Sequence, residues 1–396
     1  MGSEKIRVAV IGAGTMGSGI AQVSAAAGHD TFIYDTQAAV LSSAEKKLQD
    51  TFDKLKSKGK MSQDEAEAAF RHIHFVNELS ELKACGIAIE AIIENVAVKQ
   101  KVFSELEKIL GENAILASNT SSLSVTSIAG ACKHPERVIG IHFFNPAPLM
   151  PLVEIIPGIM TSDETLSSAL SIIKSWGKTT VKVKDTPGFI VNRVARPFYG
   201  ESIRIFEERC YGLPEGEQGM ATIDWAMKEI GGFRMGPFEL MDLIGNDINY
   251  TVTETVWTQF FYDPRYKPSL TQKRIVEAGR LGRKSGRGYY DYREGAAKAE
   301  PLRDEKIGRK IFERVLAMLV NEAADALYLG IASREDLDLA MTSGVNYPKG
   351  LLKWSDEIGV EIIMGTLEDL RATYMEERYR PSVLLKKVSE GHRKFY

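Results

Sequence analysis

The stretch Ile6-Arg7-Val8-Ala9-Val10-Ile11-Gly12-Ala13-Gly14-Thr15-Met16-Gly17 decides the fold. An apolar run that leads into the glycine pattern G-x-G-x-x-G predicts a buried strand, a tight turn and the start of a helix. Gly12 permits the turn, Gly14 lets backbone N–H groups approach a pyrophosphate, and Gly17 lets the helix pack closely on the strand. The helix N-terminus that follows favours an anion. The stretch therefore predicts a dinucleotide-binding loop, with contacts from its three glycines and from Thr15 and Met16.

A second apolar run, Thr31–Tyr34, ends at Asp35. An acidic residue in this place accepts hydrogen bonds from the ribose diol of NAD and repels the 2′-phosphate of NADP. The next two residues, Thr36 and Gln37, supply no cation that would offset this repulsion. The sequence therefore favours NAD as the cofactor. The alternative for the whole segment is a phosphate-free turn in an α/β domain.

Apolar runs and helical patterns alternate over residues 1–184, which is typical of a doubly wound sheet of parallel strands. The pattern changes at Asp185-Thr186-Pro187-Gly188, after which helices dominate, with a kink or break expected at Pro197. The predicted strands are 6–11, 31–34, 87–93, 114–117, 138–143, 152–156 and 179–183. We predict an α/β fold with a Rossmann-type domain (1–184), a first helical domain (185–293), a linker (294–304) and a second helical domain (305–396).

The second helical segment repeats the first. Ile223-Asp224-Trp225-Ala226-Met227 is echoed 114 residues later by Leu337-Asp338-Leu339-Ala340-Met341. Three further residues recur at the same offset: Gly236 as Gly350, Asp242 as Asp356 and Gly245 as Gly359. A match that keeps its spacing over this length indicates a duplicated helical domain. The alternative is a pair of unrelated helical segments that share composition.

Composition excludes several classes of protein. The 396 residues carry a net charge of −3, which is not typical of a nucleic-acid-binding protein. No apolar run reaches the roughly 18 residues of a membrane span, and the first strand begins too early to leave room for a signal peptide. The three cysteines form no C-x-x-C pair, which fits a reducing compartment and argues against a zinc site or a disulfide framework. We therefore expect a cytoplasmic protein without a metal.

Polar side chains follow two of the predicted strands. Ser118-Asn119-Thr120-Ser121-Ser122 comes after strand 114–117, and His142 stands at the end of strand 138–143. The carboxyl ends of parallel strands meet at one edge of the sheet, where doubly wound folds bind their ligands. These residues are therefore candidates for a catalytic site. A Ser/Thr run in this place also suits a helix N-cap.

Glu154 lies within the apolar run Leu152–Ile156. A buried carboxylate needs a partner, and His142 is the candidate. Such a carboxylate would fix the imidazole tautomer and favour its protonated form, as a general base requires. The alternative is a structural ion pair. Asn192 lies in the first turns of the helix that follows Gly188, and its position alone indicates only an amide on a helix surface.

Together these motifs resemble the L-3-hydroxyacyl-CoA dehydrogenase family, which carries out the NAD-dependent oxidation step of β-oxidation. The matching runs cover the first 292 residues in order: Gly12–Gly17, Ser118–Ser122, His142–Pro146, Asp185–Arg193, Met235–Leu240 and Gly282–Tyr290. The resemblance implies that His142 is the general base and that Glu154 orients it. It further implies that Ser121 and Asn192 hydrogen-bond the substrate oxygen.

The same resemblance implies further ligand contacts. Glu94, Lys99 and Asn119 would lie near the nicotinamide and its ribose. Thr51 and Lys58, on the helices after the second strand, would contact coenzyme A. The lysines around Lys58 suit phosphates, and they equally suit a solvated charged face. The implied partner is an acyl-CoA substrate.

The second helical copy departs from the shorter family members, which end near the position of residue 292. Similar extensions occur in fused β-oxidation enzymes and in phenylacetate-pathway relatives. Because the helical domain is the dimerisation unit of the family, we expect the two copies to pack as an internal pseudo-dimer. The chain itself would be a monomer or a homo-oligomer. No counterpart of Asn192 stands out near Ile307–Phe312, so we expect one active site per chain.

The acyl group is not fixed by these motifs. A short-chain substrate of the 3-hydroxybutyryl-CoA type is the first expectation. The alternative is 3-hydroxyadipyl-CoA, whose terminal carboxylate would favour a cation in the acyl pocket, with Arg234 and Arg204 as candidates. A gulonate-type polyol dehydrogenase and a non-catalytic, crystallin-like structural protein on the same fold are the remaining alternatives.

Overall fold

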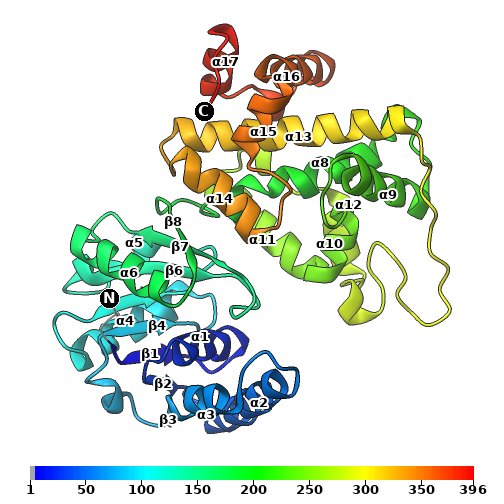
Figure 1. Ribbon diagram of the computed structural model, residues 1–396. Helices are drawn as coiled ribbons and strands as arrows, with labels where there is room; N and C mark the ends of the chain where they lie inside the picture. The colour runs from blue at the N-terminus through cyan, green and yellow to red at the C-terminus, as the bar shows by residue number, and fades with distance from the viewer. Residues whose placement is uncertain (1–4) are drawn as a thin grey trace. The chain divides into compact units, whose positions relative to one another are not determined.

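A single eight-stranded sheet forms the first of two compact units in the computed structural model, which describes residues 5–396 (Figure 1). The first unit extends to Phe189 and the second runs from Ile190 to Tyr396. The strands are β1 (Val8–Ile11), β2 (Thr31–Tyr34), β3 (Ile73–Val76), β4 (Ile87–Glu90), β5 (Ile115–Ser118), β6 (Val138–Phe143), β7 (Leu152–Pro157) and β8 (Thr179–Lys182).

The strand order is β3-β2-β1-β4-β5-β6-β7-β8. The first six strands are parallel to one another, and their order is that of a dinucleotide-binding fold. The order in which successive strands are added to the sheet reverses between β1 and β4. Ligands bind in the crevice at such a switch point, outside the carboxyl ends of the strands. The predicted doubly wound architecture is therefore present.

Two features of the sheet differ from the prediction. Strand β3 was not expected, because it lies at the sheet edge with His74 exposed and Phe75 half-buried, and it lacks a continuous apolar run. Strand β7 was expected to be parallel, and it is antiparallel to β6. Only residues 144–151 connect these two strands, which is too short for the crossover that a parallel pair needs.

The helices of the first unit bury one face each. Helix α2 buries Leu41, Ala44, Leu48 and Phe52, whose spacing of three and four residues places them on one side. Helix α3 begins with a capping box between Ser62 and Glu65. The helices are α1 (Thr15–Ala26), α2 (Ala38–Ser57), α3 (Gln63–Arg71), α4 (Val96–Ile109), α5 (Val125–Ala129) and α6 (Asp163–Ser175).

The second unit is helical throughout its regular elements. The regular helix is interrupted between α7 and α8 at Ala195, close to the break expected at Pro197, although the φ and ψ of Ala195 stay in the right-handed helical region. Residues 294–304 contain neither helix nor strand. The helices before this segment are α7 (Val191–Val194), α8 (Arg196–Glu207), α9 (Gly216–Trp225), α10 (Pro237–Ile244), α11 (Asn246–Gln259) and α12 (Leu270–Glu277). Those after it are α13 (Glu305–Tyr328), α14 (Arg334–Gly344), α15 (Leu351–Ile358), α16 (Val360–Tyr374) and α17 (Val383–Glu390).

The same capping device occurs in both helical segments. Asp224 of α9 accepts hydrogen bonds from the N–H groups of Phe238 and Glu239, at 2.9 and 3.0 Å, and so caps α10. Asp338 of α14 caps α15 in the same way, with bonds of 2.8 and 3.0 Å. The glycine before each capped helix is required, because a Cβ atom there would lie within 2.5 Å of the aspartate side chain.

Helix α13 packs on α7 and α8, and buried arginine–glutamate pairs join it to both. On one side, Glu322 of α13 accepts hydrogen bonds from Arg193 Nε at 2.6 Å and from the Tyr266 hydroxyl at 2.5 Å. Arg193 also pairs with Asp325 at 3.0 Å. Here the glutamate belongs to the second helical segment, and its two main donors belong to the first.

The opposite arrangement joins α13 to α8. Glu201 of α8 accepts hydrogen bonds from Arg314 Nε at 2.6 Å and from the Tyr379 hydroxyl at 2.8 Å. Arg314 also pairs with Glu208 at 3.0 Å. The two segments therefore exchange roles across their contact, which is the property of an isologous interface between two copies.

Candidate active site

The loop between β1 and α1 needs glycine at two positions for steric reasons. Gly12 has φ of +102°, and a Cβ atom there would lie 2.7 Å from the Ala91 carbonyl oxygen. A Cβ atom on Gly17 would lie 1.8 Å from the Gly12 carbonyl oxygen, so the helix packs directly on the loop. Gly14 is different, because a Cβ atom there would meet nothing within 4 Å.

The open space at Gly14 fits a pyrophosphate. Gly14 is the N-cap of α1, and as a glycine it has no side chain that could cap the first N–H groups of the helix. Such groups bind anions, with help from the helix dipole. Asp35 lies beside them, and its carboxylate accepts hydrogen bonds of 2.9 Å from the N–H groups of Ala13 and Gln37. The residues predicted to hold a dinucleotide are thus gathered at the carboxyl ends of β1 and β2.

A buried charge cluster stands next to this loop. Lys99 is only 1% exposed, and its Nζ lies 2.6 Å from Glu90 Oε1 and 3.2 Å from Glu94 Oε2. Ser118 donates a hydrogen bond of 2.7 Å to the other oxygen of Glu90. The lysine therefore joins the end of β4 to the turn after it, and the serine joins β4 to β5.

Glu94 holds the polar loop after β5. Its Oε1 accepts hydrogen bonds from the Thr120 hydroxyl at 2.5 Å and from the Ser121 N–H at 3.0 Å. Burial raises the pKa of Glu94, but the charge of Lys99 and the bond from Thr120 lower it further, so the pKa lies below its ordinary value. The carboxylate is consequently ionised at neutral pH, and it fixes the backbone on which Ser121 stands.

Asn119 ties the same loop to the next strand. Its Oδ1 accepts a hydrogen bond of 2.8 Å from the N–H of Phe143, at the end of β6. His142 is the neighbouring residue in that strand. The position of the imidazole is thereby linked to the loop that carries Ser121.

His142 and Glu154 are directly opposite each other on the antiparallel strands β6 and β7. His142 Nδ1 lies 2.7 Å from Glu154 Oε2, and both side chains are buried. The rings of Phe144 and Phe189 flank the imidazole, with centroids 4.5 and 5.8 Å away. Because the carboxylate accepts the proton on Nδ1, Nε2 of the neutral ring carries the lone pair that can accept a proton from a ligand.

The structure distributes the four predicted catalytic residues over both units. His142, Glu154 and Ser121 lie in the first unit, within the network just described, and Ser121 is half-buried. Asn192 lies in α7 of the second unit, and it is also half-buried. The catalytic roles of all four remain predictions at this point.

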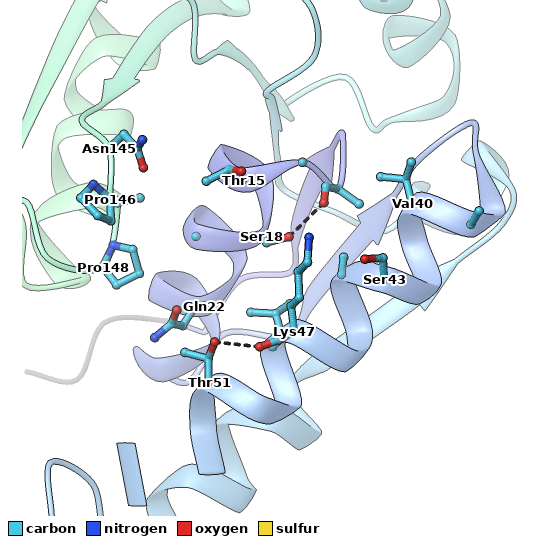
Figure 2. A pocket seen from close by; sticks show the side chains of 17 residues that line it. Thr15, Ser18, Gln22, Val40, Ser43, Lys47, Thr51, Asn145, Pro146 and Pro148 are labelled. Carbon is cyan, nitrogen blue, oxygen red and sulfur yellow. Dashed lines mark hydrogen bonds between the residues drawn. The ribbon is translucent and has the colours of Figure 1, made fainter. Parts of the chain in front are cut away.

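A groove of about 540 Å³ opens beside the nucleotide loop (Figure 2). Helices α1 and α2 line it together with the turn Asn145–Pro148. Thr51 lies in its wall, and its hydroxyl donates a hydrogen bond of 2.7 Å to the Lys47 carbonyl oxygen. Lys58, the other predicted coenzyme A contact, does not line this groove. It is the exposed residue at the C-terminal end of α2.

Sequence reasoning missed two residues of this region. Lys47 stands one helical turn before Thr51 and lines the groove as an exposed cation (Figure 2), so its spacing on α2 was the available signal. Glu90 ends an apolar strand in the same way as Glu154, and the same argument from a buried carboxylate would have singled it out.

Within residues 5–396, no three His, Cys, Asp or Glu side chains gather as metal ligands would. No helix in this range combines the length and the apolar character needed to cross a membrane.

Comparison with known proteins assigns the family. Residues 7–186 match the family model described as 3-hydroxyacyl-CoA dehydrogenase, NAD binding domain. The model of the C-terminal domain of that family matches residues 188–292 and again residues 311–394. The chain therefore belongs to the 3-hydroxyacyl-CoA dehydrogenase family, and it is an NAD-dependent oxidoreductase.

Individual relatives cover the chain to different extents. A 3-hydroxyadipyl-CoA dehydrogenase of Escherichia coli (strain K12) is 36% identical over 96% of both chains. A probable 3-hydroxybutyryl-CoA dehydrogenase of Bacillus subtilis (strain 168) is 41% identical over 73% of this chain and 98% of its own. The crystal structure of a 3-hydroxybutyryl-CoA dehydrogenase from E. coli K12 superposes with a TM-score of 0.91 at 35% identity, over 98% of this chain and 100% of that one.

Proposed function

We propose that the protein oxidises the 3-hydroxyl group of a short-chain L-3-hydroxyacyl-CoA to a 3-oxoacyl-CoA, with NAD as the acceptor. One observation carries the proposal: a buried imidazole–carboxylate pair, His142 and Glu154, stands on the sheet that also holds the nucleotide loop. A substrate of the 3-hydroxybutyryl-CoA type is supported by the shorter relatives, whose names specify it.

The chemistry divides between the cofactor and the chain. Bound NAD would supply the acceptor for the hydride that leaves C3 with both electrons of the C–H bond. Nε2 of His142 takes the proton of the 3-hydroxyl group, and Glu154 stabilises the imidazolium that results. General base catalysis of this kind contributes about 10²- to 10⁴-fold in rate. Ser121 and Asn192 donate hydrogen bonds to the substrate oxygen and hold it in place as it becomes a carbonyl oxygen.

Coenzyme A is assigned to the groove between α1 and α2. The groove lies beside the nucleotide loop and offers Lys47 and Thr51 to a polar ligand. Lys58 lies at the end of the same helix, where an exposed lysine suits a phosphate of coenzyme A.

A second candidate substrate is 3-hydroxyadipyl-CoA. The relative named for it spans nearly the whole chain, including the second helical segment, as does the E. coli structure named as a 3-hydroxybutyryl-CoA dehydrogenase. The B. subtilis and Bradyrhizobium relatives named for 3-hydroxybutyryl-CoA span about three quarters. The polyol dehydrogenase and the non-catalytic structural protein are not favoured, because the chain belongs to the 3-hydroxyacyl-CoA dehydrogenase family. We further propose that the protein is cytoplasmic and that its helical copies act as an internal pseudo-dimer, in a monomer or a homo-oligomer.

The test of the proposed function is His142→Gln. The glutamine retains a hydrogen-bond donor for Glu154 but cannot act as the base. We expect kcat for NADH oxidation with acetoacetyl-CoA to fall about 10²- to 10⁴-fold, and NADH binding, followed by its fluorescence, to persist. His134→Gln, at an exposed position of the same unit, serves as the matched control. An undiminished kcat in His142→Gln would show that the base is misassigned.

A further inference from the structure

Arg196 is a buried cation that lacks a carboxylate partner. It begins α8 and is 7% exposed. Its Nη1 donates a hydrogen bond of 3.1 Å to the Thr253 hydroxyl, and its buried Nε has no hydrogen-bond partner. No aspartate or glutamate among residues 5–396 forms an ion pair with it. Burial lowers the pKa of Arg196, since the charged form is poorly solvated there.

The other deeply buried arginines of this unit are all paired. Arg193 has Glu322, Arg314 has Glu201, and the guanidinium of Arg378 lies 3.3 Å from Glu208. A buried charge without a partner costs several kcal/mol. A position with a purely structural role would therefore be expected to carry a neutral side chain, and Arg196 needs another explanation.

The second helical copy shows that the helix packing does not require this arginine. Arg193-Val194 of the first copy corresponds to Arg314-Val315 of the second, and Glu201 corresponds to Glu322, always 121 residues later. At the same offset, Arg196 corresponds to Ala317, which is also buried. The helix pair thus packs with a small apolar residue at this position.

The surroundings of Arg196 include a second unsatisfied donor. The guanidinium lies over the ring of Tyr199, 5.0 Å from its centroid. Its charge also acts on Tyr347, a residue of the second helical copy whose buried hydroxyl has no hydrogen-bond partner. Tyr347 borders a cavity of about 70 Å³ together with Phe198 and Val345. The Nε of Arg196 and the hydroxyl of Tyr347 are buried donors without acceptors, and Tyr347 borders the cavity. Such donors match the needs of a carboxylate.

We propose that Arg196 and Tyr347 bind the terminal carboxylate of the acyl chain, so that of the two candidate substrates the dicarboxylic 3-hydroxyacyl-CoA is preferred over the 3-hydroxybutyryl type. This inference rests on the proposed function, in which Asn192 contacts the oxygen on C3. Arg196 follows Asn192 by four residues, and Ala195 between them is in right-handed helical conformation. Four helical residues advance about 6 Å along the axis. In a six-carbon chain the carboxylate lies three carbon–carbon bonds beyond C3, about 4 Å when extended. The two spacings agree within the reach of the side chains.

The proposal also gives the second helical copy a role in specificity. Tyr347 follows α14, and α14 contacts the helix that carries Asn192. Asn346 beside it has φ of +53°, a left-handed conformation that asparagine tolerates better than most residues. The second copy would therefore complete a subsite that the first copy does not form alone.

The experiment compares two substrates of equal length, 3-oxoadipyl-CoA and 3-oxohexanoyl-CoA, which differ in the terminal carboxylate. For the wild-type protein we expect kcat/KM to be at least about tenfold higher with 3-oxoadipyl-CoA. In Arg196→Met, we expect kcat/KM for this substrate to fall about 10- to 100-fold, mainly through KM. The value for 3-oxohexanoyl-CoA should stay within about threefold.

Two further variants keep the test decisive. Tyr347→Phe should lower kcat/KM for 3-oxoadipyl-CoA about threefold to tenfold without affecting 3-oxohexanoyl-CoA. Arg274→Met makes the same change at an exposed arginine and should alter neither value. If Arg196→Met does not fold, the substrate preference of the wild type and the effect of Tyr347→Phe still decide the question.

The outcomes separate this inference from the proposed function. Equal kcat/KM for the two substrates in the wild type would overturn the carboxylate subsite and leave the dehydrogenase assignment in place. A loss of the preference in Arg234→Met, the exposed arginine at the same cavity, with Arg196→Met unchanged, would also overturn it. If the wild type reduces neither substrate nor acetoacetyl-CoA, the proposed function itself fails.

Discussion

The two helical copies differ in a way that separates structural residues from functional ones. Both keep the arginine and the glutamate that cross their contact, and both keep the aspartate that caps the following helix. Among the positions where the paired helices differ, Asn192, Arg196 and Tyr199 become Glu313, Ala317 and Val320. The arginine, the glutamate and the capping aspartate occur in both copies, whereas Asn192 and Arg196, which we assign to the substrate, occur only in the first. The comparison therefore supports functional roles for Asn192 and Arg196 without reference to other proteins.

The largest effect should come from the residues that both copies share. Glu201→Ala and Glu322→Ala each remove the main partner of a buried arginine, and breaking a buried ion pair typically costs 3–5 kcal/mol. We expect about 3 kcal/mol of destabilisation in each variant, the lower end of that range, because Asp325 or Glu208 still neutralises the arginine. Unfolding in urea measures the loss.

The comparison predicts that Glu201→Ala and Glu322→Ala lose similar amounts of unfolding free energy, since the two clusters contain the same groups with the roles of the copies exchanged. Glu305→Ala, which removes only an exposed pair with Arg309, should change the stability little. If one glutamate proved dispensable, the copies would not be equivalent in their packing, and the assignment of shared residues to structure would fail.

An intermediate effect is expected where the copies differ. Asn192→Ala should lower kcat about 10²- to 10³-fold with acetoacetyl-CoA and NADH, as the loss of one donor to a reacting oxygen does in other enzymes. Glu313→Ala, at the corresponding exposed position of the second copy, should leave kcat unchanged. Both variants should unfold at about the same temperature as the wild type. Full activity in Asn192→Ala would mean that the first copy holds no catalytic group there.

Much of the fold could be predicted because its signals are local. The glycine loop, the apolar strands and the break near Pro197 each depend on a few neighbouring residues. The contact between Glu154 and His142 could also be predicted, since a carboxylate in an apolar strand must find a partner. Glu90, which is buried at the end of β4, could be predicted by the same argument that a buried carboxylate needs a partner.

The rest depends on contacts between distant parts of the chain. The repeat at an offset of 114 holds for α9, α10 and their counterparts. It predicts that the counterpart of Asn192 lies near residues 307–312. The paired helices α8 and α13 are related by an offset of 121, so the counterpart is Glu313. The loops between the helices differ in length, and only the crossed Arg–Glu pairs reveal the shift.

The smallest effect concerns the capping aspartates. Burial, and then the nearby charge of Glu239, raises the pKa of Asp224 to about 8, despite the hydrogen bonds that it accepts. Burial also raises the pKa of Asp338, which has Asp356 as its acidic neighbour. An aspartate in the unfolded chain titrates near pH 4. Between about pH 4 and 8 the folded chain therefore holds a proton on Asp224 that the unfolded chain has lost, and stability declines as the pH rises through this window.

Asparagine at this position would abolish the titration and keep an oxygen that accepts a hydrogen bond from α10. One proton contributes a slope of at most about 1.4 kcal/mol per pH unit. We expect the decline in unfolding free energy between pH 5 and 8 to be shallower in Asp224→Asn than in the wild type, and Asp338→Asn to flatten it less. Urea unfolding at pH 5, 6, 7 and 8 provides the slopes. Identical slopes in the two variants would mean that the charge of Glu239 has no measurable influence on the pKa of Asp224. The two capping aspartates would then be equivalent, and the copies would differ only at the substrate positions.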